Sequence, residues 1–239
     1  MLKDLNEKLK LYGLKKFIKY SFSEVCSVLY WRGIRKSYSQ KQEDLIIDKL
    51  LSHKKNGFYV DIGTSDPNRF NNTKRFYLKG WHGINIEPNP RIFERIKEDR
   101  KKDINLNIGI GDNEGKMNFF IFFPDTLSTF SEEEAKNYIK QGFRIIKEVK
   151  IGVRKLVKVF EEYAEETMDF LSIDTEGCDL DVLKSNNWER YRPKLICVEL
   201  YAHNENNSEA LNIENYLTSV DYLKKVDNKL NGIFVDSKN

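Results

Sequence analysis

The residues best suited to bind a ligand stand where two apolar runs of the sequence end. Asp61 and Gly63 end the run 57–63, and Glu87 ends the run 84–87. A glycine at 63 lets the main chain approach a ligand closely, and Asp61 can accept from an ammonium group or hold the loop through its N–H groups. The two oxygens of Glu87 can accept both hydroxyls of a ribose. Together these positions predict a nucleoside-binding site.

The glycine pattern indicates that this nucleoside carries no phosphate. Pyrophosphate-binding loops need G-x-G-x-x-G, whereas the loop 60–67, which includes Thr64, contains Gly63 alone. A phosphate-free nucleoside with a charged amino-acid tail is S-adenosylmethionine. Asn107 and Asp112, in the third apolar run and just after it, could contact the adenine edge or cap a turn.

A second acidic group follows a further apolar run and could provide a general base. Asp174 and Glu176 stand two residues apart, and a hydroxyl acceptor needs a carboxylate or a histidine to take its proton. His203 is a third candidate base, or an incidental loop histidine. Glu176 and Asp179 could instead cap a helix. Together with Asp174 they could also ligate Mg²⁺, so metal dependence stays open.

Strands and helices must alternate to bring these residues together. Apolar runs predict strands at 58–62, 83–86, 104–110, 168–173 and 195–200, and helical patterns occur at 41–53, 72–79, 90–101, 155–166, 179–186 and 209–219. This alternation predicts an α/β fold, with a mostly parallel sheet covered by helices on both faces. Segments 220–226 and 233–235 predict a closing antiparallel hairpin, which brings the sheet to seven strands. In such sheets ligands bind at the carboxyl ends of the strands.

The segment 119–153 fits the alternation least well. It runs from an aromatic stretch at 119–124 into a polar, helical segment around 131–141. An insertion after the third strand predicts a lid that faces the substrate. Several aromatic side chains could give an acceptor ring an apolar face, although such residues are more often core: Tyr77, Trp81, Phe130 and Tyr201.

The charge is unevenly distributed along the chain, and its distribution limits the kinds of partner that we expect. The 239 residues carry a net charge of +3, but residues 1–36 hold nine Lys or Arg against three Asp or Glu, a net +6, which leaves −3 for the rest. No basic and aromatic stripe runs along the domain, so no nucleic-acid partner is expected. The basic segment could make peripheral contact with an anionic lipid or a phosphorylated carrier, or pack on the domain as a helix.

The sequence also predicts a cytoplasmic protein. No apolar run is long enough to span a membrane, and the first residues are charged where a signal peptide would be apolar. The three cysteines are far apart and show neither disulfide nor zinc spacing, which fits a reducing compartment.

Several motifs, in order along the chain, resemble the FkbM family of methyltransferases. The resemblance covers about 200 of the 239 residues. It rests on Ser39-Gln40 with Glu43-Asp44, Asp61-Ile62-Gly63, Asn72-Thr73 with Phe76-Tyr77, Gly80-Trp81 and Gly83, Ile86-Glu87-Pro88, Ser128-Thr129, Asp174-Thr175-Glu176-Gly177 with Asp179, and Arg192-Pro193-Lys194. It implies a Rossmann-like class I methyltransferase domain at 39–239, preceded by a basic helical extension at 1–38, with S-adenosylmethionine as donor.

The resemblance also implies roles for individual residues. It places Asp61, Gly63 and Glu87 at the cofactor and makes Gln40 a lid contact to it. We expect Thr64, Pro88 and Asp174 to bind the cofactor as well. Asp174 and Glu176 are implied near methyl transfer, and Ser128 and Thr129 in the acceptor pocket. The leading hypothesis is O-methylation of a sugar, glycan or glycolipid hydroxyl. The alternatives are O-methylation of a polyketide or other small molecule, and a catalytically silent module that keeps the cofactor as structure.

Overall fold

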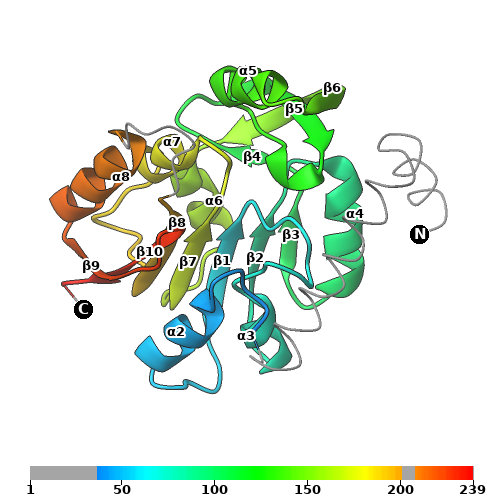
Figure 1. Cartoon of the computed structure of the whole chain (residues 1–239). Helices are drawn as coiled ribbons and strands as arrows, with labels where there is room; N and C mark the ends of the chain where they lie inside the picture. The colour runs from blue at the N-terminus through cyan, green and yellow to red at the C-terminus, as the bar shows by residue number, and fades with distance from the viewer. Residues whose placement is uncertain (1–36, 201–207, 239) are drawn as a thin grey trace.

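A seven-stranded sheet forms the centre of the computed structural model, which describes residues 37–200 and 208–238 (Figure 1). Its strand order is β3-β2-β1-β7-β8-β10-β9. The strands are β1 Phe58–Ile62, β2 His82–Ile86, β3 Ile104–Leu106, β7 Phe170–Ile173, β8 Leu195–Glu199, β9 Tyr222–Asp227 and β10 Asn231–Asp236. The first five named are parallel, whereas β10 runs antiparallel to both β8 and β9. The predictions made for residues 1–36, Tyr201 and His203 lie outside the described residues.

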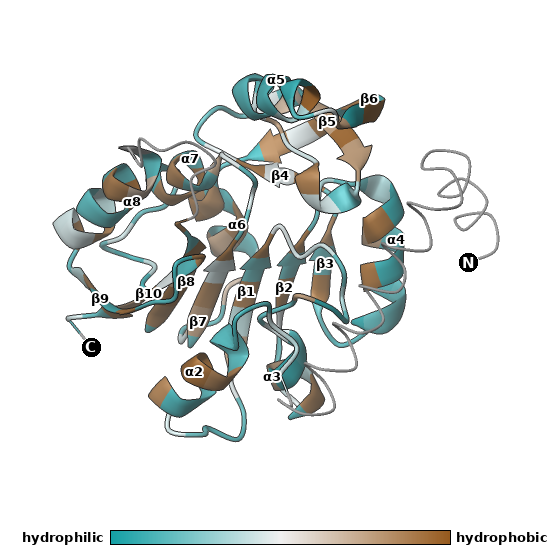
Figure 2. Cartoon of the chain, viewed as in Figure 1, coloured by the Kyte–Doolittle hydropathy of each residue, from teal (hydrophilic) through white to brown (hydrophobic). Residues whose placement is uncertain are grey.

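Helices cover both faces of this sheet, because side chains of successive strand residues point to opposite sides. Tyr59 packs in one apolar cluster with residues of α2 (Glu43–Leu50) and α3 (Lys74–Leu78). Phe58 and Val60 pack in another cluster with α6 (Leu156–Tyr163), α7 (Asp179–Lys184) and α8 (Ser208–Ser219). The central strands are mostly hydrophobic and the helices mixed (Figure 2). The predicted fold class, including the closing hairpin, is confirmed.

The insertion forms a small sheet of its own above the carboxyl ends of the central strands (Figure 1). It contains β4 Gly109–Ile110, β5 Gly115–Phe123, the 3₁₀ helix η2 Asp125–Leu127, α5 Glu132–Lys140 and β6 Arg144–Arg154. The single strand predicted at 104–110 is wrong, because β3 ends at Leu106 and β4 pairs with β6 instead. The amide of Asn107 explains the break: it donates to the main-chain oxygens of Glu87 and Pro88 and fixes a turn.

Within 37–200 and 208–238, no helix combines the length and the apolar character needed to cross a membrane.

Candidate active site

The strand register brings four residues into one row at the carboxyl edge of the sheet. Ile62 of β1 pairs with Ile86 of β2 and with Ile173 of β7, and Ile173 pairs with Val198 of β8. The residues that follow these four are therefore neighbours across the edge: Glu87, Gly63, Asp174 and Glu199. Three of the four were predicted at the site from the sequence. The row begins at Glu87, the carboxylate predicted to bind a ribose, and it includes Asp174, a candidate base.

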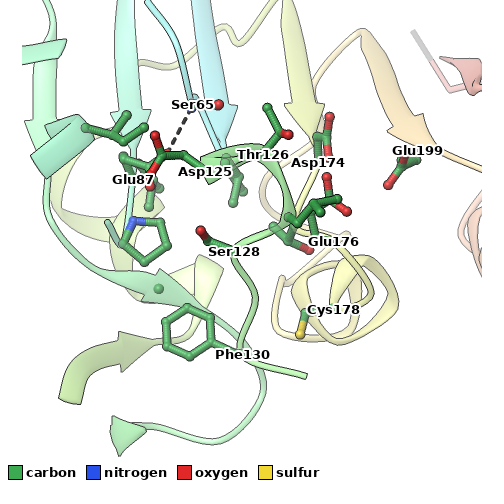
Figure 3. A pocket seen from close by; sticks show the side chains of 18 of the residues that line it. Ser65, Glu87, Asp125, Thr126, Ser128, Phe130, Asp174, Glu176, Cys178 and Glu199 are labelled. Carbon is green, nitrogen blue, oxygen red and sulfur yellow. Dashed lines mark hydrogen bonds between the residues drawn. The ribbon is translucent and has the colours of Figure 1, made fainter. Parts of the chain in front are cut away.

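A cavity of about 410 Å³ lies over this row. All four residues of the row line it, and the insertion contributes Phe119, η2, Ser128 and Phe130 (Figure 3). Gln40, from the segment before α2, also lines the cavity. The insertion therefore faces the predicted site. Of the aromatic candidates, Phe130 lines the cavity, whereas Trp81 is fully buried in the core against Phe76 and Phe170.

Gly63 is required by the packing of β1 against the segment after β7. Its φ is +79°, and a Cβ at this position would lie 1.8 Å from the carbonyl oxygen of Asp174. Its N–H donates to the carbonyl oxygen of Ile86 at 2.9 Å. Only glycine therefore allows the ends of β1, β2 and β7 to lie this close together. Gly63 therefore has a packing role in addition to the close approach to a ligand that its position predicts.

Asp61 holds the loop that follows β1. Its carboxylate is buried and accepts hydrogen bonds from the Thr73 hydroxyl at 2.7 Å and from the Asn71 amide at 3.3 Å. Burial raises the pKa of Asp61 to about 6. Thr64 is buried too, and its hydroxyl donates to the main-chain oxygen of Asp61. Neither side chain is among those that line the cavity, and Asp61 holds its loop through the side chains of Thr73 and Asn71, where the prediction named backbone N–H groups.

Glu87 keeps its carboxylate at the cavity wall through two backbone contacts. Oε2 accepts from the N–H of Ser65 at 2.9 Å, and Oε1 accepts from the N–H of Asn89 at 2.8 Å. Burial raises the pKa of Glu87 to about 7. Pro88 lines the cavity beside it. Each carboxylate oxygen can accept a further hydrogen bond, so Glu87 retains acceptor capacity toward a ligand.

Three further predicted site residues, besides Asp61 and Thr64, lie away from the cavity. Asn107 makes the turn described above, which was the alternative left open for it. Asp112 is half exposed and forms an ion pair of 2.9 Å with Lys155. Asp179 is the first residue of α7, where its carboxylate accepts from the N–H of Thr175 at 3.1 Å. Asp179 thus stands in the first turn of a helix, as the helix-capping alternative predicts, but its carboxylate holds the segment before the helix.

Glu176 is held by contacts from the insertion. Oε2 accepts a hydrogen bond of 2.5 Å from the phenol of Tyr138, and its main-chain oxygen accepts from the Thr129 hydroxyl at 2.8 Å. Glu176 also has a left-handed φ of 53°, which costs energy in a residue with a side chain. Thr129 is fully buried, so it supports the Glu176 turn, while its neighbour Ser128 faces the cavity.

Three carboxylates meet at the β7–β8 end of the cavity. Burial raises the pKa of Asp174, Glu176 and Glu199 above their ordinary values, and repulsion from Asp174 raises the pKa of the other two further. Asp174 is exposed to the cavity that it lines, and the protein packed around it still disfavours its charged form. Carboxylates whose pKa values are raised toward neutrality suit proton transfer at physiological pH.

Two acidic residues at the cavity were missed by sequence reasoning. Glu199 ends the apolar strand β8, and an acid at the end of an apolar strand is the same signal that identifies Asp174. Asp125 lies in the irregular η2, and its partner Arg91 lies in α4 (Pro90–Asp99), so no local pattern could have found this ion pair.

The predicted Mg²⁺ ligands do not converge. Among residues 37–200 and 208–238, no three His, Cys, Asp or Glu side chains are arranged to hold a metal ion. Asp174 and Glu176 line the cavity, whereas Asp179 is turned to the start of α7.

The strand order, the closing hairpin and the row of residues at the carboxyl edge define a Rossmann-like class I methyltransferase fold. Residues 61–224 match the methyltransferase FkbM domain, and the chain belongs to this family. The protein is therefore an S-adenosylmethionine-dependent methyltransferase. Among curated proteins, none matches the sequence.

Solved methyltransferase structures show a distant likeness to this chain. A putative caffeoyl-CoA O-methyltransferase from Staphylococcus aureus is 13% identical, with 93% of this chain and 98% of that chain covered and a TM-score of 0.45. A TehB-like SAM-dependent methyltransferase from Corynebacterium glutamicum is 10% identical, with 87% and 94% covered and a TM-score of 0.43. The 1,6-didemethyltoxoflavin-N1-methyltransferase from Burkholderia thailandensis, which contains S-adenosylhomocysteine, is 8% identical, with 90% and 85% covered and a TM-score of 0.43. Likenesses this distant say nothing about the acceptor.

Proposed function

We propose that the protein transfers a methyl group from S-adenosylmethionine to a hydroxyl of a sugar, glycan or glycolipid. The observation that carries this proposal is the pairing of Glu87, at one end of the cavity, with the carboxylates Asp174 and Glu176, which line the other end and have raised pKa values. The first suits a ribose, and the others suit removal of a proton from a hydroxyl.

The residues at the Glu87 end fit the cofactor. The wall beside Glu87 is apolar, with Pro88, Ile92 and Ile110 available to pack on an adenine ring. Among the described lining residues there is no Lys, Arg or His, so this end has no cation for a pyrophosphate. The volume of about 410 Å³ lies in the ordinary range for small-molecule sites. Gln40 and Gly63 complete the wall on the β1 side.

The residues at the other end, Asp174 and Glu176, are placed to remove the proton of the acceptor hydroxyl. The cofactor supplies a methyl group bonded to a positively charged sulfur. The ionised carboxylate of Glu176 accepts the proton of the acceptor hydroxyl. The oxygen of that hydroxyl takes the methyl group, whose bond to the sulfur breaks. Tyr138 and Thr129 keep Glu176 in place for this step. Asp174 adds negative charge beside it, which favours a positively charged cofactor.

The charge of the wall favours an acceptor without phosphate. Five carboxylates line the cavity: Glu87, Asp125, Asp174, Glu176 and Glu199. Arg91, which lies outside the lining, pairs with one of them, Asp125, whereas the described lining residues themselves include no cation. A phosphate entering this space would be repelled at every carboxylate that stays ionised. A neutral sugar hydroxyl is not repelled, and the rings of Phe119 and Phe130 offer it an apolar face.

The test is turnover with labelled S-adenosylmethionine on matched acceptors: neutral sugars and glycans, their phosphate esters, and polyketide alcohols. We expect O-methylation of a neutral carbohydrate and weak turnover of its phosphate ester. Preferential methylation of a polyketide alcohol, or of an amine, would contradict the proposed acceptor class.

A further inference from the structure

Asp125 lines the cavity from the insertion, and one of its two carboxylate oxygens has no hydrogen-bond partner. Its Oδ2 accepts from the guanidinium of Arg91 on α4. Its Oδ1 is buried and has no hydrogen-bond partner, although the residue lines the cavity. Leaving a buried carboxylate oxygen without a donor is unfavourable, so a ligand that brings a hydroxyl to this atom gains binding energy.

The neighbour of Asp125 in the cavity is Glu87. Figure 3 shows the two carboxylates side by side, and Asp125 is near enough for its charge to act on Glu87. Each oxygen of Glu87 already accepts one backbone N–H, from Ser65 and from Asn89. Two acceptors from different parts of the chain therefore meet at the point proposed for the ribose.

We infer that Asp125 accepts a hydrogen bond from one ribose hydroxyl of the cofactor and Glu87 from the other. A ribose presents two vicinal hydroxyls, and each donates one hydrogen, so two carboxylates can share them without competing. Two like charges placed this close are unfavourable alone, and donors bound between them relieve that repulsion. The division replaces the simpler assignment of both hydroxyls to Glu87.

The inference gives the insertion a role at both ends of the cavity. Its η2 supplies Asp125 to the cofactor, and its α5 supplies Tyr138 to Glu176. Arg91, from the main domain, forms an ion pair with Asp125 at Oδ2, the oxygen that the inference does not use. This step rests on the proposed cofactor site and is independent of the identity of the acceptor.

The test is calorimetric titration of S-adenosylhomocysteine and its 2′-deoxy and 3′-deoxy analogues into the full chain. We expect Asp125→Ala to weaken S-adenosylhomocysteine by about 10- to 100-fold, the range for hydrogen bonds to a charged group. One deoxy analogue should bind wild type more weakly than the parent ligand, yet bind Asp125→Ala about as tightly as the parent does. The other analogue should show that relation with Glu87→Ala.

Two controls separate direct contact from a displaced insertion. Asp112→Ala removes an acid that is paired with Lys155 away from the cavity, and it should leave all three affinities unchanged. Arg91→Gln removes the ion pair and keeps Asp125, so it should keep the discrimination between the deoxy analogues. If Arg91→Gln lost that discrimination as Asp125→Ala does, direct contact would be overturned.

Three further results would overturn the inference. The first is wild-type affinity in Asp125→Ala, and the second is an equal loss of affinity for all three ligands in that variant. The third is that an analogue without the 6-amino group of adenine binds wild type more weakly but binds Asp125→Ala as tightly as the parent ligand does, which would place Asp125 at the adenine. If Glu87→Ala weakened binding while Asp125→Ala did not, the proposed cofactor site would stand and only this inference would fail.

Discussion

The phenol of Tyr138, on α5 of the insertion, donates a hydrogen bond of 2.5 Å to Oε2 of Glu176, in the turn after β7. Tyr138 is almost fully buried, so this bond is shielded from water. A hydrogen bond to the charged form of a carboxyl lowers its pKa, and here it opposes the effects of burial and of Asp174. The insertion therefore helps to keep Glu176 ionised, as a base must be.

Replacing Tyr138 by Phe should shift the pH dependence of methyl transfer. The pKa of Glu176 would rise, so the pH below which kcat falls should move upward by about one unit, given a charge-assisted hydrogen bond of roughly 1.5 kcal/mol. The measurement is kcat as a function of pH.

Tyr222→Phe is the matched control for this change. Tyr222 is also buried, and its hydroxyl donates to the carbonyl oxygen of Pro193 in the region of the hairpin. It should lose comparable stability and keep the wild-type pH profile. Identical shifts in both variants would show that the Tyr138–Glu176 bond does not tune the base.

Gly63→Ala should destabilise the fold more than a change of backbone freedom explains. Its Cβ would collide with the carbonyl oxygen of Asp174, 1.8 Å away, and would force β1 and β7 apart. We expect a loss of about 3 kcal/mol or more in the free energy of unfolding, measured by urea denaturation.

Gly80→Ala isolates the backbone contribution, because Gly80 has a φ of +96° and nothing lies within 4 Å of its Cβ position. It should lose only about 1 kcal/mol. Equal losses at the two positions would mean that Gly63 is required for its φ alone.

The stability of the ligand-free protein should fall as the pH rises from about 4.5 to 7. Burial raises the pKa of Glu87 from its ordinary 4.5 to about 7, so the folded state holds a proton in this window that the unfolded state has lost. Burial also raises the pKa of Asp61 to about 6 and that of Asp179 to about 7, which adds to the effect.

Glu87→Gln should reduce the change in the free energy of unfolding between pH 4.5 and 7 by at most about 3 kcal/mol, since one pKa unit corresponds to about 1.36 kcal/mol. Urea unfolding at a series of pH values measures it. A slope in Glu87→Gln equal to that of the wild type would contradict the raised pKa.

The acids at the ends of apolar strands could be found from the sequence, because parallel strands bring their carboxyl ends to one edge. That reasoning placed Glu87, Gly63 and Asp174 in the row that the register confirms, and the same signal would have found Glu199. It could not say that the carboxylate of Asp61 turns into its own loop, because that depends on Thr73 and Asn71.

The insertion shows the limit of such reasoning. Its aromatic stretch and its polar helix were visible in the sequence, and the structure confirms that it faces the carboxyl edge. The contacts that matter join positions far apart in the chain, 34 residues for Arg91 and Asp125 and 38 for Tyr138 and Glu176. Contacts set by tertiary packing at such separations leave no periodic signal in a single sequence.

The most direct test of the proposed chemistry compares wild type with Glu176→Gln on the carbohydrate acceptor that turns over best. Labelled donor locates the new methyl group, and calorimetry measures S-adenosylhomocysteine binding. We predict a methyl group on a hydroxyl oxygen, and a Glu176→Gln variant that binds S-adenosylhomocysteine like wild type but has a kcat lower by about 10²- to 10⁴-fold, the usual contribution of a general base. Glu133→Gln, an exposed acid on α5, should match wild type in both assays. A methyl group on nitrogen or carbon, or a wild-type kcat in Glu176→Gln, would contradict the account.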